Sequence, residues 1–283
     1  MRSADQPIPE ETTVSQDDAP AVSAQADPVL TLNQLSVSFG GVCALDRVDF
    51  EVYPHEIVAL VGENAAGKST LAKVVAGVYH PSSGTILVDG REVTIGSPQA
   101  ATRLGIATVF QELALADNLD VAANMFLGHE IHQGSVMRQA EMENAARQTL
   151  DEIGARIPSV RYPIAQLSAG QRQSVAIARA LLIKPRIVIL DEPTSRLSIT
   201  QTAEVLELIV HLRDKGLGVV LISHNLADIQ AVADRIVILR HGRVVASSPM
   251  AQVSYEDIVA TMTGAAHTLP VPQAVRVSRL VGP

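Results

Sequence analysis

"EIVALVGENAAGKST", residues 56–70, is the stretch that decides the fold. It runs from a nearly all-apolar segment, typical of a buried strand, into a loop that contains glycine. The segment after the loop, 69–78, has helical spacing, and its apolar face carries Leu71, Val74 and Val75. Strand, loop and helix in this order are the setting that a phosphate-binding loop requires. The sequence therefore predicts an α/β protein with such a loop.

The loop itself has the spacing Gly62-x4-Gly67-Lys68-Ser69. Backbone N–H groups of such a loop point inward at phosphate oxygens, and the following helix adds the positive end of its dipole. Lys68 is placed to reach the β- and γ-phosphates of a nucleotide, and the Ser69 hydroxyl to ligate Mg²⁺. We expect the whole loop to contact the nucleotide, namely Gly62, Glu63, Asn64, Ala65, Ala66, Gly67, Lys68, Ser69 and Thr70.

Composition supports this class and argues against others. Apolar residues make up 47% of the 283 residues and aromatic residues only 3%, so the core must be built mainly from Val, Ile, Leu and Ala, as in buried parallel sheets. The net charge of −8 without a visible basic patch argues against nucleic acid as a partner. No apolar run is long enough to predict a membrane span. The single cysteine, Cys43, is expected to be a small buried hydrophobe.

A second motif, "IVILDEP" at 187–193, carries two adjacent carboxylates. Its four apolar residues predict a buried strand with Asp191 at the C-terminal edge, where ligands of open α/β sheets gather. We expect Asp191 to hold Mg²⁺, directly or through water, and Glu192 to polarise the attacking water as general base. Taken alone, the motif would be an ordinary strand that ends in an acidic turn.

A third motif, "LSAGQRQ" at 167–173, lies at the predicted start of a helix and shortly before "ILDEP". A serine followed by a small residue and a glycine at a helix start can cradle an anion. The alternative is an ordinary helix cap, because the Ser168 hydroxyl is a good N-cap. The position of the motif in a chain that already has a phosphate loop favours the anion cradle.

Together the three motifs resemble the nucleotide-binding domain of ATP-binding-cassette (ABC) transporters. Residues 62–69 match the Walker A motif, 167–171 the LSGGQ signature, and 187–192 the Walker B motif with its catalytic glutamate. The resemblance extends over about 29–264, and a signature just before Walker B is specific to this family. It implies ATP and Mg²⁺ as cofactors. It also implies an α/β fold: a P-loop NTPase core with an antiparallel β-subdomain and an inserted α-helical subdomain.

The resemblance assigns three further residues. Gln111 in "VFQELAL" resembles the glutamine that senses Mg²⁺ and the membrane partner. His224 in "LISHNL" resembles the histidine that contacts the γ-phosphate, and Phe39 in "VSFGG" the aromatic that stacks on adenine. Each has a plainer alternative: a lone Phe at a strand end is usually core, and a lone His after a strand is usually a surface or capping residue.

The mechanism implied by the resemblance uses two cassettes that meet head to tail, with each ATP between the Walker A loop of one and the signature of the other. One side would supply Lys68, Ser69, Gln111, Asp191, Glu192 and His224, of which Lys68, Gln111, Glu192 and His224 are the catalytic group. The facing side would supply Ser168, Gly170 and Gln171. ATP would support closure, and hydrolysis with product release would permit reopening.

Three more segments, "NMFLGHEI" at 124–131, 222–245 and "MTG" at 262–264, resemble importers of monosaccharides of the ribose, xylose and fructose type. With one cassette, the chain resembles the single-cassette members of that group. The implied partners are a second copy or a related ATPase, integral membrane permease subunits and, indirectly, a soluble sugar-binding protein. This places the chain at the cytoplasmic side of the cell membrane as a peripheral protein. The sugar itself is not identified, because this subunit does not touch it.

The chain divides into three predicted parts. Residues 1–27 are acidic and rich in Pro, Ser and Ala, without the apolar region of a signal peptide, and we expect a disordered tail. Residues 28–264 form the ABC ATPase domain, with the helical subdomain at about 98–182 and a hairpin around Asp89-Gly90. Residues 265–283 are expected to be a loose tail. One helix is predicted to bury a stripe of Met142, Ala146, Leu150 and Ile153.

Two positions depart from the family pattern. Ala65 stands where a glycine is common; if its φ is positive, the Cβ costs on the order of 1 kcal/mol and crowds the nucleotide. In "EPTSRLS", Arg196 replaces a small residue and Ser198 often an Asp or Thr. This segment faces the partner's Walker A in the family, where an arginine could clash or could reach a phosphate or carboxylate. Because Glu192 and His224 are present, we expect a working ATPase that is at most slowed.

Two other functions fit the sequence less well. A nucleotide-binding regulatory subunit that hardly hydrolyses ATP and works beside a more active ATPase is motivated by Ala65 and Arg196, and opposed by Glu192 and His224. A soluble cassette protein of DNA repair or translation would carry long coiled coils, zinc sites or two cassettes. This chain has no cluster of cysteines and no basic face, which argues against that class.

Overall fold

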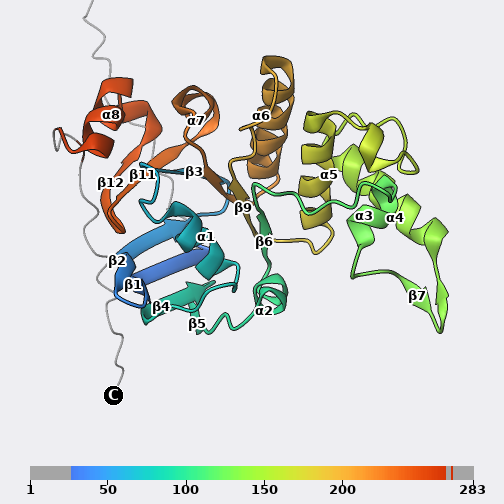
Figure 1. The fold of residues 1–283 in the computed structure, drawn as a ribbon, viewed down its shortest axis with the longest axis horizontal. Coiled ribbons are helices and arrows are strands. Elements are labelled where there is room, and N and C mark those ends of the chain that lie inside the picture. Colours follow the sequence, from blue (N-terminus) through green and yellow to red (C-terminus); the bar gives the residue numbers. More distant parts are fainter. Residues whose placement is uncertain (1–26, 266–268, 270–283) are drawn as a thin grey trace, which may run out of the picture.

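The fold described here is that of a computed structural model, which describes residues 27–265 and residue 269 (Figure 1). Two larger β-sheets, a two-stranded one and a group of helices make up this part of the chain. The predicted tails, 1–27 and 265–283, lie almost wholly outside the described residues.

The central sheet has six strands in the order β12-β11-β3-β10-β9-β6. Its strands are β3 (Glu56–Val61), β6 (Ile106–Val109), β9 (Ile187–Asp191), β10 (Gly218–Ile222), β11 (Arg235–Arg240) and β12 (Arg243–Pro249). All neighbouring pairs are parallel except β11 and β12. Every residue of β9 and β10 is buried, which explains why these strands read as continuous apolar runs.

The register of the central sheet brings the ends of four strands together. Leu60 of β3 lies opposite Ile222 of β10, and Ile222 lies opposite Asp191 of β9. Leu190 of β9 lies in turn opposite Val109 of β6. The loops that follow these strands therefore leave the sheet side by side, along one edge, as expected for ligand sites of parallel sheets.

A second, antiparallel sheet has the order β2-β1-β4-β5. Its strands are β1 (Leu30–Phe39), β2 (Val42–Val52), β4 (Ser83–Val88) and β5 (Arg91–Val93). The predicted hairpin at Asp89-Gly90 is confirmed, and both residues have the positive φ, 50° and 72°, that a tight hairpin turn requires. The first residues of β2, Val42 and Cys43, pair with the end of β1 and are exposed, so this end of the strand lies outside the core.

The helices are α1 (Lys68–Val75), α2 (Pro98–Arg103), α3 (Val121–Phe126), α4 (Gln139–Glu152), α5 (Ala169–Leu181), α6 (Ile199–Asp214), α7 (Leu226–Val232) and α8 (Tyr255–Thr263), with short 3₁₀ turns at Ile164–Gln166 and Met250–Gln252. Helices α3, α4 and α5 group together, away from the antiparallel sheet (Figure 1). The predicted stripe on α4 is confirmed. Its four side chains are all buried: Met142, Ala146, Leu150 and Ile153.

The stretch at about 98–182, predicted to be the helical subdomain, also contains strands. Strand β6 belongs to the central sheet, and β7 (His132–Gln133) pairs with β8 (Val136–Met137) in a small hairpin. Four residues are too few to give β6 a periodic signal, so the pattern missed it. The boundaries 98–182 for a helical subdomain remain a prediction.

The two faces of the central sheet bury different clusters. Along β10, Val219 and Leu221 pack with α5 and α6, whereas Val220 and Ile222 pack with α1 and the antiparallel sheet. This alternation sandwiches the sheet between two apolar layers and leaves its edge to the loops that carry the site. Within the described residues, no helix has both the length and the apolar content to cross a bilayer.

Candidate functional site

The two glycines of the predicted phosphate loop lie against neighbouring backbone. Gly62 has φ 155° and Gly67 has φ 109°, conformations that favour glycine. A Cβ on Gly62 would lie 2.1 Å from the carbonyl oxygen of Leu239, and one on Gly67 would lie 2.8 Å from that of Ala44. Only glycine fits at either position, so the loop is clamped between β11 and β2 before it enters α1.

Ala65, in the same loop, also has a positive φ, 64°. The residue is exposed, whereas its neighbour Ala66 is buried and does not share this conformation. An alanine is disfavoured against glycine in this region by on the order of 1 kcal/mol. The strain that we predicted for a positive φ at Ala65 is therefore present.

Lys68 and Ser69 open α1 and face the end of β9. Nζ of Lys68 donates hydrogen bonds to the carbonyl oxygens of Gly62, at 2.6 Å, and Glu63, at 2.9 Å. Burial lowers the pKa of Lys68, and the negative charges of Glu192 and Asp191, at the end of β9, oppose that shift. The Ser69 hydroxyl donates a hydrogen bond to Asp191. The structure thus joins the first and second motifs through these two side chains.

Asp191 is the buried carboxylate of the site, with 8% of its surface exposed. Burial raises its pKa, and the neighbouring charge of Glu192 adds to the rise. The positive charges of Lys68 and Lys73 lower the pKa in opposition, as does the Ser69 hydrogen bond. The sequence reading missed Lys73; its only signal was a cation on the same short helix as Lys68.

Glu192 and His224 meet across the ends of β9 and β10. Glu192 has a left-handed backbone, φ 53°, and its N–H donates to the carbonyl oxygen of Ile222 at 2.9 Å. Its Oε2 lies 2.7 Å from Nδ1 of His224. Of the two plainer alternatives for His224, the capping residue does not apply, because Asn225 caps α7, whereas the side chain is 68% exposed, as the surface alternative predicts.

Gln111 follows β6 and is exposed. It lines a cavity together with Glu192 and Arg196. Arg196 is exposed and forms no ion pair among the described residues. Arg196, which departs from the family pattern, therefore lines the same cavity as Gln111 and Glu192, two of the predicted catalytic residues.

The segment after Gln111 is tied to α5 by Arg179, a residue that the sequence reading missed. The guanidinium of Arg179 donates to the carbonyl oxygens of Leu113, at 2.7 Å, and Ala114, at 2.9 Å. Burial lowers the pKa of Arg179, and within the described residues no carboxylate pairs with it. The available signal was a single cation inside the apolar run "AIARALL".

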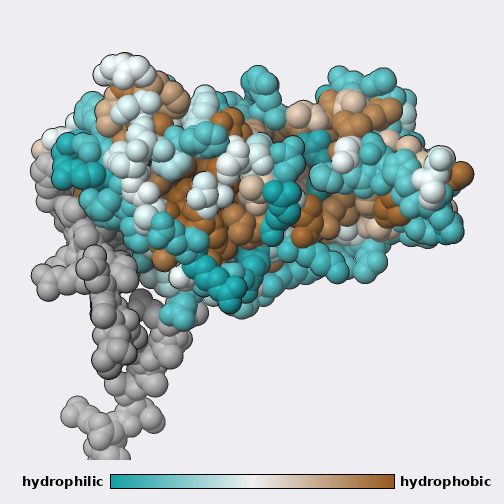
Figure 2. All heavy atoms as spheres, turned by 90° about the horizontal axis from the view of Figure 1, so that it is seen from below, coloured by the Kyte–Doolittle hydropathy of each residue, from teal (hydrophilic) through white to brown (hydrophobic). Residues whose placement is uncertain are grey.

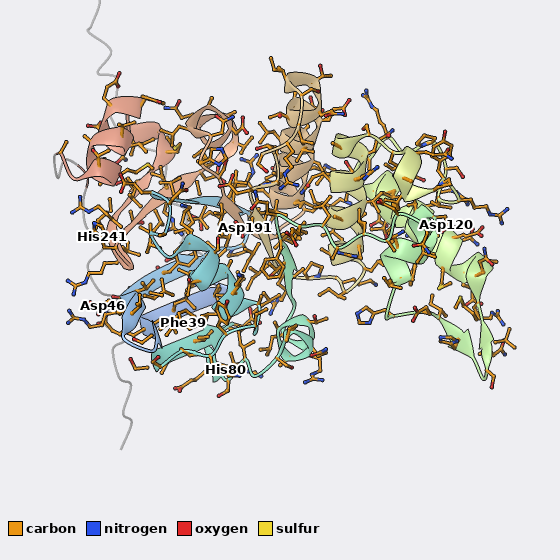
Figure 3. All side chains as sticks on the ribbon, viewed as in Figure 1. Phe39, Asp46, His80, Asp120, Asp191 and His241 are labelled. Atoms are coloured by element: carbon orange, nitrogen blue, oxygen red, sulfur yellow. The ribbon has the colours of Figure 1, made fainter. Side chains whose placement is uncertain are left out.

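Phe39 lies at the end of β1 and is 47% exposed. The alternative that it is an ordinary core residue is therefore wrong. Its ring, labelled in Figure 3, contacts the ring of Tyr79, with centroids 4.9 Å apart. Cys43 is exposed as well, which corrects the expectation of a buried thiol: the start of β2 lies outside the core, and the Cys43 thiol donates only to the carbonyl oxygen of Leu45.

The signature residues form a helix cap. The Ser168 hydroxyl accepts a hydrogen bond from the N–H of Gln171 at 3.2 Å, and the Gln171 side chain accepts one from the N–H of Ser168 at 3.0 Å. Gly170 lies against α6, where a Cβ would come within 3.0 Å of Gln201. The capping interpretation is thus confirmed. Within the described part of the chain, no hydrogen bond joins these residues to the phosphate loop.

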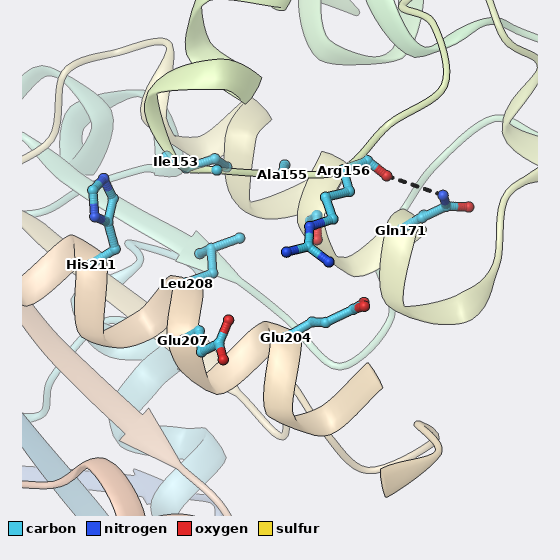
Figure 4. Close-up of a pocket in the computed structure, with 10 residues that line it drawn as sticks. Ile153, Ala155, Arg156, Gln171, Glu204, Glu207, Leu208 and His211 are labelled. Atoms are coloured by element: carbon cyan, nitrogen blue, oxygen red, sulfur yellow. Dashed lines mark hydrogen bonds between the residues drawn. The ribbon is translucent and has the colours of Figure 1, made fainter. Parts of the chain in front are cut away.

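Gln171 also borders a separate cavity, between α5, α6 and the loop after α4 (Figure 4). Its Nε2 donates to the carbonyl oxygen of Arg156 at 3.1 Å. Glu204 and Glu207 of α6 line the opposite wall. Apart from Gln171, none of the predicted site residues reaches this cavity.

Comparison with known proteins places the chain in a family. A family model described as "ABC transporter" matches residues 45–195. The chain is 43% identical to the Fructose import ATP-binding protein FrcA of Rhizobium meliloti, over 84% of this chain and 95% of that protein. It is 39% identical to the Xylose/arabinose import ATP-binding protein XylG of Sulfolobus acidocaldarius, over 83% and 94%. Against the Ribose import ATP-binding protein RbsA 2 of Escherichia coli O157:H7 it is 42% identical and spans about half of that chain, 47%.

Solved structures share the fold. A nucleotide-free ATP-binding cassette from an ABC transporter superposes with a TM-score of 0.73 at 23% identity, over 84% of this chain and 96% of the other. A dimeric post-hydrolysis ATP-binding cassette bound to ADP and Pi superposes with a TM-score of 0.66 at 25% identity, over 78% and 98%. With the motifs, the fold and the family match in agreement, the chain belongs to the ABC transporter family, as one of its ATP-binding cassettes.

Proposed function

We propose that this chain is the ATP-hydrolysing subunit that energises import of a simple sugar through a membrane ABC transporter. The observation that carries the proposal is the meeting of three strand ends, where Lys68 and Ser69 face Asp191 and where Glu192 pairs with His224 at 2.7 Å. The sugar-import part rests on the relatives named for fructose, ribose and xylose import.

The residues fit a magnesium-bound nucleotide. The Ser69 hydroxyl, the Asp191 carboxylate and the Gln111 amide are hard oxygen donors of the kind that Mg²⁺ prefers. Among the described residues no group of three His, Cys, Asp or Glu side chains could hold a metal ion by itself. That absence suits Mg²⁺, which is usually held by one or two carboxylates together with substrate phosphates. Bound there, Mg²⁺ would neutralise charge on the phosphate oxygens.

The chain's own residues would then divide the work. The loop N–H groups and Lys68 bind and orient the phosphates, exchanging the lysine's carbonyl partners for phosphate oxygens. Glu192 accepts a proton from the attacking water, and His224 holds the carboxylate in place through Nδ1. Phe39 offers an exposed ring to the base. Ser168, Gly170 and Gln171 are proposed to act on the nucleotide of a second cassette.

The partners are proposed to be a second copy of this chain, or a related ATPase, and integral membrane permease subunits. A dimeric cassette among the structural neighbours supports the first. For the second, apolar side chains gather on the face seen from below (Figure 2). A groove whose apolar lining comes from α2, β6, α5 and the segment just after α3 runs next to the segment that leads to Gln111. We propose that the chain sits at the cytoplasmic side of the membrane through this contact.

The test is ATP turnover by the purified full chain with Mg²⁺, beside the same assay in EDTA and beside Glu192→Gln. Turnover that requires Mg²⁺ and disappears in Glu192→Gln supports the proposal. Tight ATP binding with no turnover, alone or with co-expressed permease subunits, would instead support a regulatory subunit. Absence of ATP binding would overturn both.

A further inference from the structure

We propose that Tyr79 is a positioning residue for the nucleotide base: it holds the Phe39 ring in the orientation that stacks on adenine. The inference rests on the proposed function, because it takes Phe39 to be the base-stacking residue. It goes further, because it assigns a role to a residue outside all three motifs.

The first observation is the ring contact itself. The Phe39 and Tyr79 rings are 4.9 Å apart, centroid to centroid, at an interplanar angle of 68°. This edge-to-face arrangement is one of the two favoured geometries for aromatic pairs. Phe39 keeps 47% of its surface exposed, so a large part of its ring is available to another flat group.

The second observation is that the residues directly after Phe39 lie in open space among the described residues. It is followed by Gly40 and Gly41, and a Cβ placed on either glycine would meet nothing within 4 Å. Gly40 has φ 59°, and Val42 beyond it is 68% exposed. Within the described part of the chain, the tip of the β1–β2 hairpin is therefore open around Gly40, Gly41 and Val42, and Tyr79 supplies an aromatic contact for the Phe39 ring.

The third observation is that Tyr79 is fixed to the helix that begins at the phosphate loop. Its N–H donates to the carbonyl oxygen of Lys73 at 3.1 Å, and its side chain packs against the apolar cluster under α1. Nζ of Lys73 lies 5.5 Å from the centroid of the Tyr79 ring, within reach of a cation–π contact. Tyr79 thus couples the position of the base-stacking ring to α1, the helix whose N-terminus faces the phosphates.

Hydrogen bonds near the two rings set their separation. The N–H of Ser38 donates to the Ser82 hydroxyl at 3.1 Å, and the N–H of Ser82 donates to the carbonyl oxygen of Ser36 at 2.7 Å. These bonds join the residue before Phe39 to the segment just after Tyr79. A pre-ordered ring binds the base at a smaller entropic cost than a ring that must be immobilised on binding.

The experiment compares Tyr79→Leu, Tyr79→Phe and Phe39→Leu with the wild type in ATP turnover, using inorganic triphosphate as a competing ligand without a base. We expect Tyr79→Leu to raise KM for ATP by about three- to tenfold, the range that loss of an aromatic pair gives, with kcat and inhibition by triphosphate unchanged. Tyr79→Phe should behave as the wild type. The double variant Phe39→Leu/Tyr79→Leu should bind ATP no more weakly than Phe39→Leu, because the two residues act as one unit.

Three results would overturn the proposal. The first is an unchanged KM in Tyr79→Leu; the second is an equal loss of triphosphate binding, which would mean that Tyr79 only supports the loop. The third is a double variant in which the two losses of ATP affinity add.

If the wild type has no ATP turnover, the proposed function fails and ATP binding is measured instead. Because the chain has no tryptophan, Phe39→Trp supplies a single reporter. Its quenching by acrylamide should increase when Tyr79→Leu is added, and no increase would count against the proposal.

Discussion

Nδ1 of His224 lies 2.7 Å from Oε2 of Glu192, although a helix and a strand separate the two residues in the chain. The contact exists because β9 and β10 are neighbours and end in register, so that the residues after them meet. Glu192 is largely enclosed, with 14% of its side chain exposed, whereas 68% of the His224 side chain is exposed. The histidine therefore lies on the solvent side of the carboxylate, at contact distance but without a hydrogen bond of normal geometry.

This pairing predicts that the two residues act as a unit. Glu192→Gln should lower kcat for ATP by at least about 100-fold, the contribution typical of a general base. His224→Ala should lower kcat by a smaller factor, because it leaves the base present but unheld. The double variant should be no slower than Glu192→Gln alone. Independent, multiplying losses in steady-state turnover would show that the histidine acts elsewhere.

Ala65→Gly should relieve the strained conformation of the loop. Glycine accepts the φ of 64° at Ala65 more readily by on the order of 1 kcal/mol. Because the strain belongs to the folded loop itself, we expect the free energy of unfolding to rise by about 1 kcal/mol, measured as a higher Tm. The matched control is Ala66→Gly, next along the loop, where the alanine is buried and unstrained and the same change should lower the Tm. Equal changes of Tm in the two variants would contradict the assignment of strain to Ala65.

Asp191→Asn should stabilise the nucleotide-free protein while abolishing Mg²⁺-dependent turnover. The pKa of Asp191 is raised above its ordinary 3.8, first by burial. A raised folded pKa means that stability is fully present below the unfolded pKa and is lost as the pH rises through the folded pKa. Because the asparagine amide does not ionise, the variant does not lose this stability as the pH rises.

The measurement is the difference in Tm between Asp191→Asn and the wild type as a function of pH. It should be small near pH 3.8 and should grow as the pH rises above that value. Asp151→Asn, an exposed change on α4, controls for the loss of one charge. A Tm difference that shrinks with rising pH would mean that the neighbouring lysines favour the ionised carboxylate, which contradicts the raised pKa of Asp191.

Arg179→Met should loosen the segment after Gln111. The guanidinium supplies the two hydrogen bonds that fix Leu113 and Ala114, and hydrogen bonds from charged groups are worth about 1.5–3 kcal/mol each. We expect amide exchange over 111–117 to become faster by about tenfold or more. Arg147→Met on α4, whose guanidinium bonds only to the adjacent side chain of Asn144, is the matched control. Unchanged exchange in Arg179→Met would show that the segment is held by other contacts.

Much of the site could be predicted because its residues lie in short, contiguous motifs. The glycine loop, Asp191 and His224 each follow an apolar run that predicts a strand. The ends of parallel strands lie at the same edge of a sheet, so these groups are expected to lie close together. The φ of Ala65 could be foreseen as a condition, since the position is one where glycine is common. The family match then agrees with these motifs.

The rest depends on contacts between distant segments. Arg179 bonds backbone carbonyls, which are present at every residue and leave no mark in the sequence. Tyr79 contacts Phe39, and Lys73 acts on the pKa of Asp191. Both pairs join segments that are distant in the chain, and the register of the two sheets determines where those segments lie. Strand β6 is too short for its periodicity to be recognised. Cys43 is exposed because β2 runs past the core, a length that no local pattern sets.

The order of strands in the central sheet has a consequence for how such a chain can diverge. The phosphate loop, His224, Glu192 and Gln111 follow β3, β10, β9 and β6, which is their lateral order and not their order along the chain. Adjacent strands are about 4.8 Å apart, so the sheet sets the spacing of these groups whatever the length of the connections between them. The segments between the motifs, such as the one that carries the β7–β8 hairpin, can therefore change in length without moving these groups. Related cassettes can acquire new partners in their connecting segments while the distances between reacting groups stay the same.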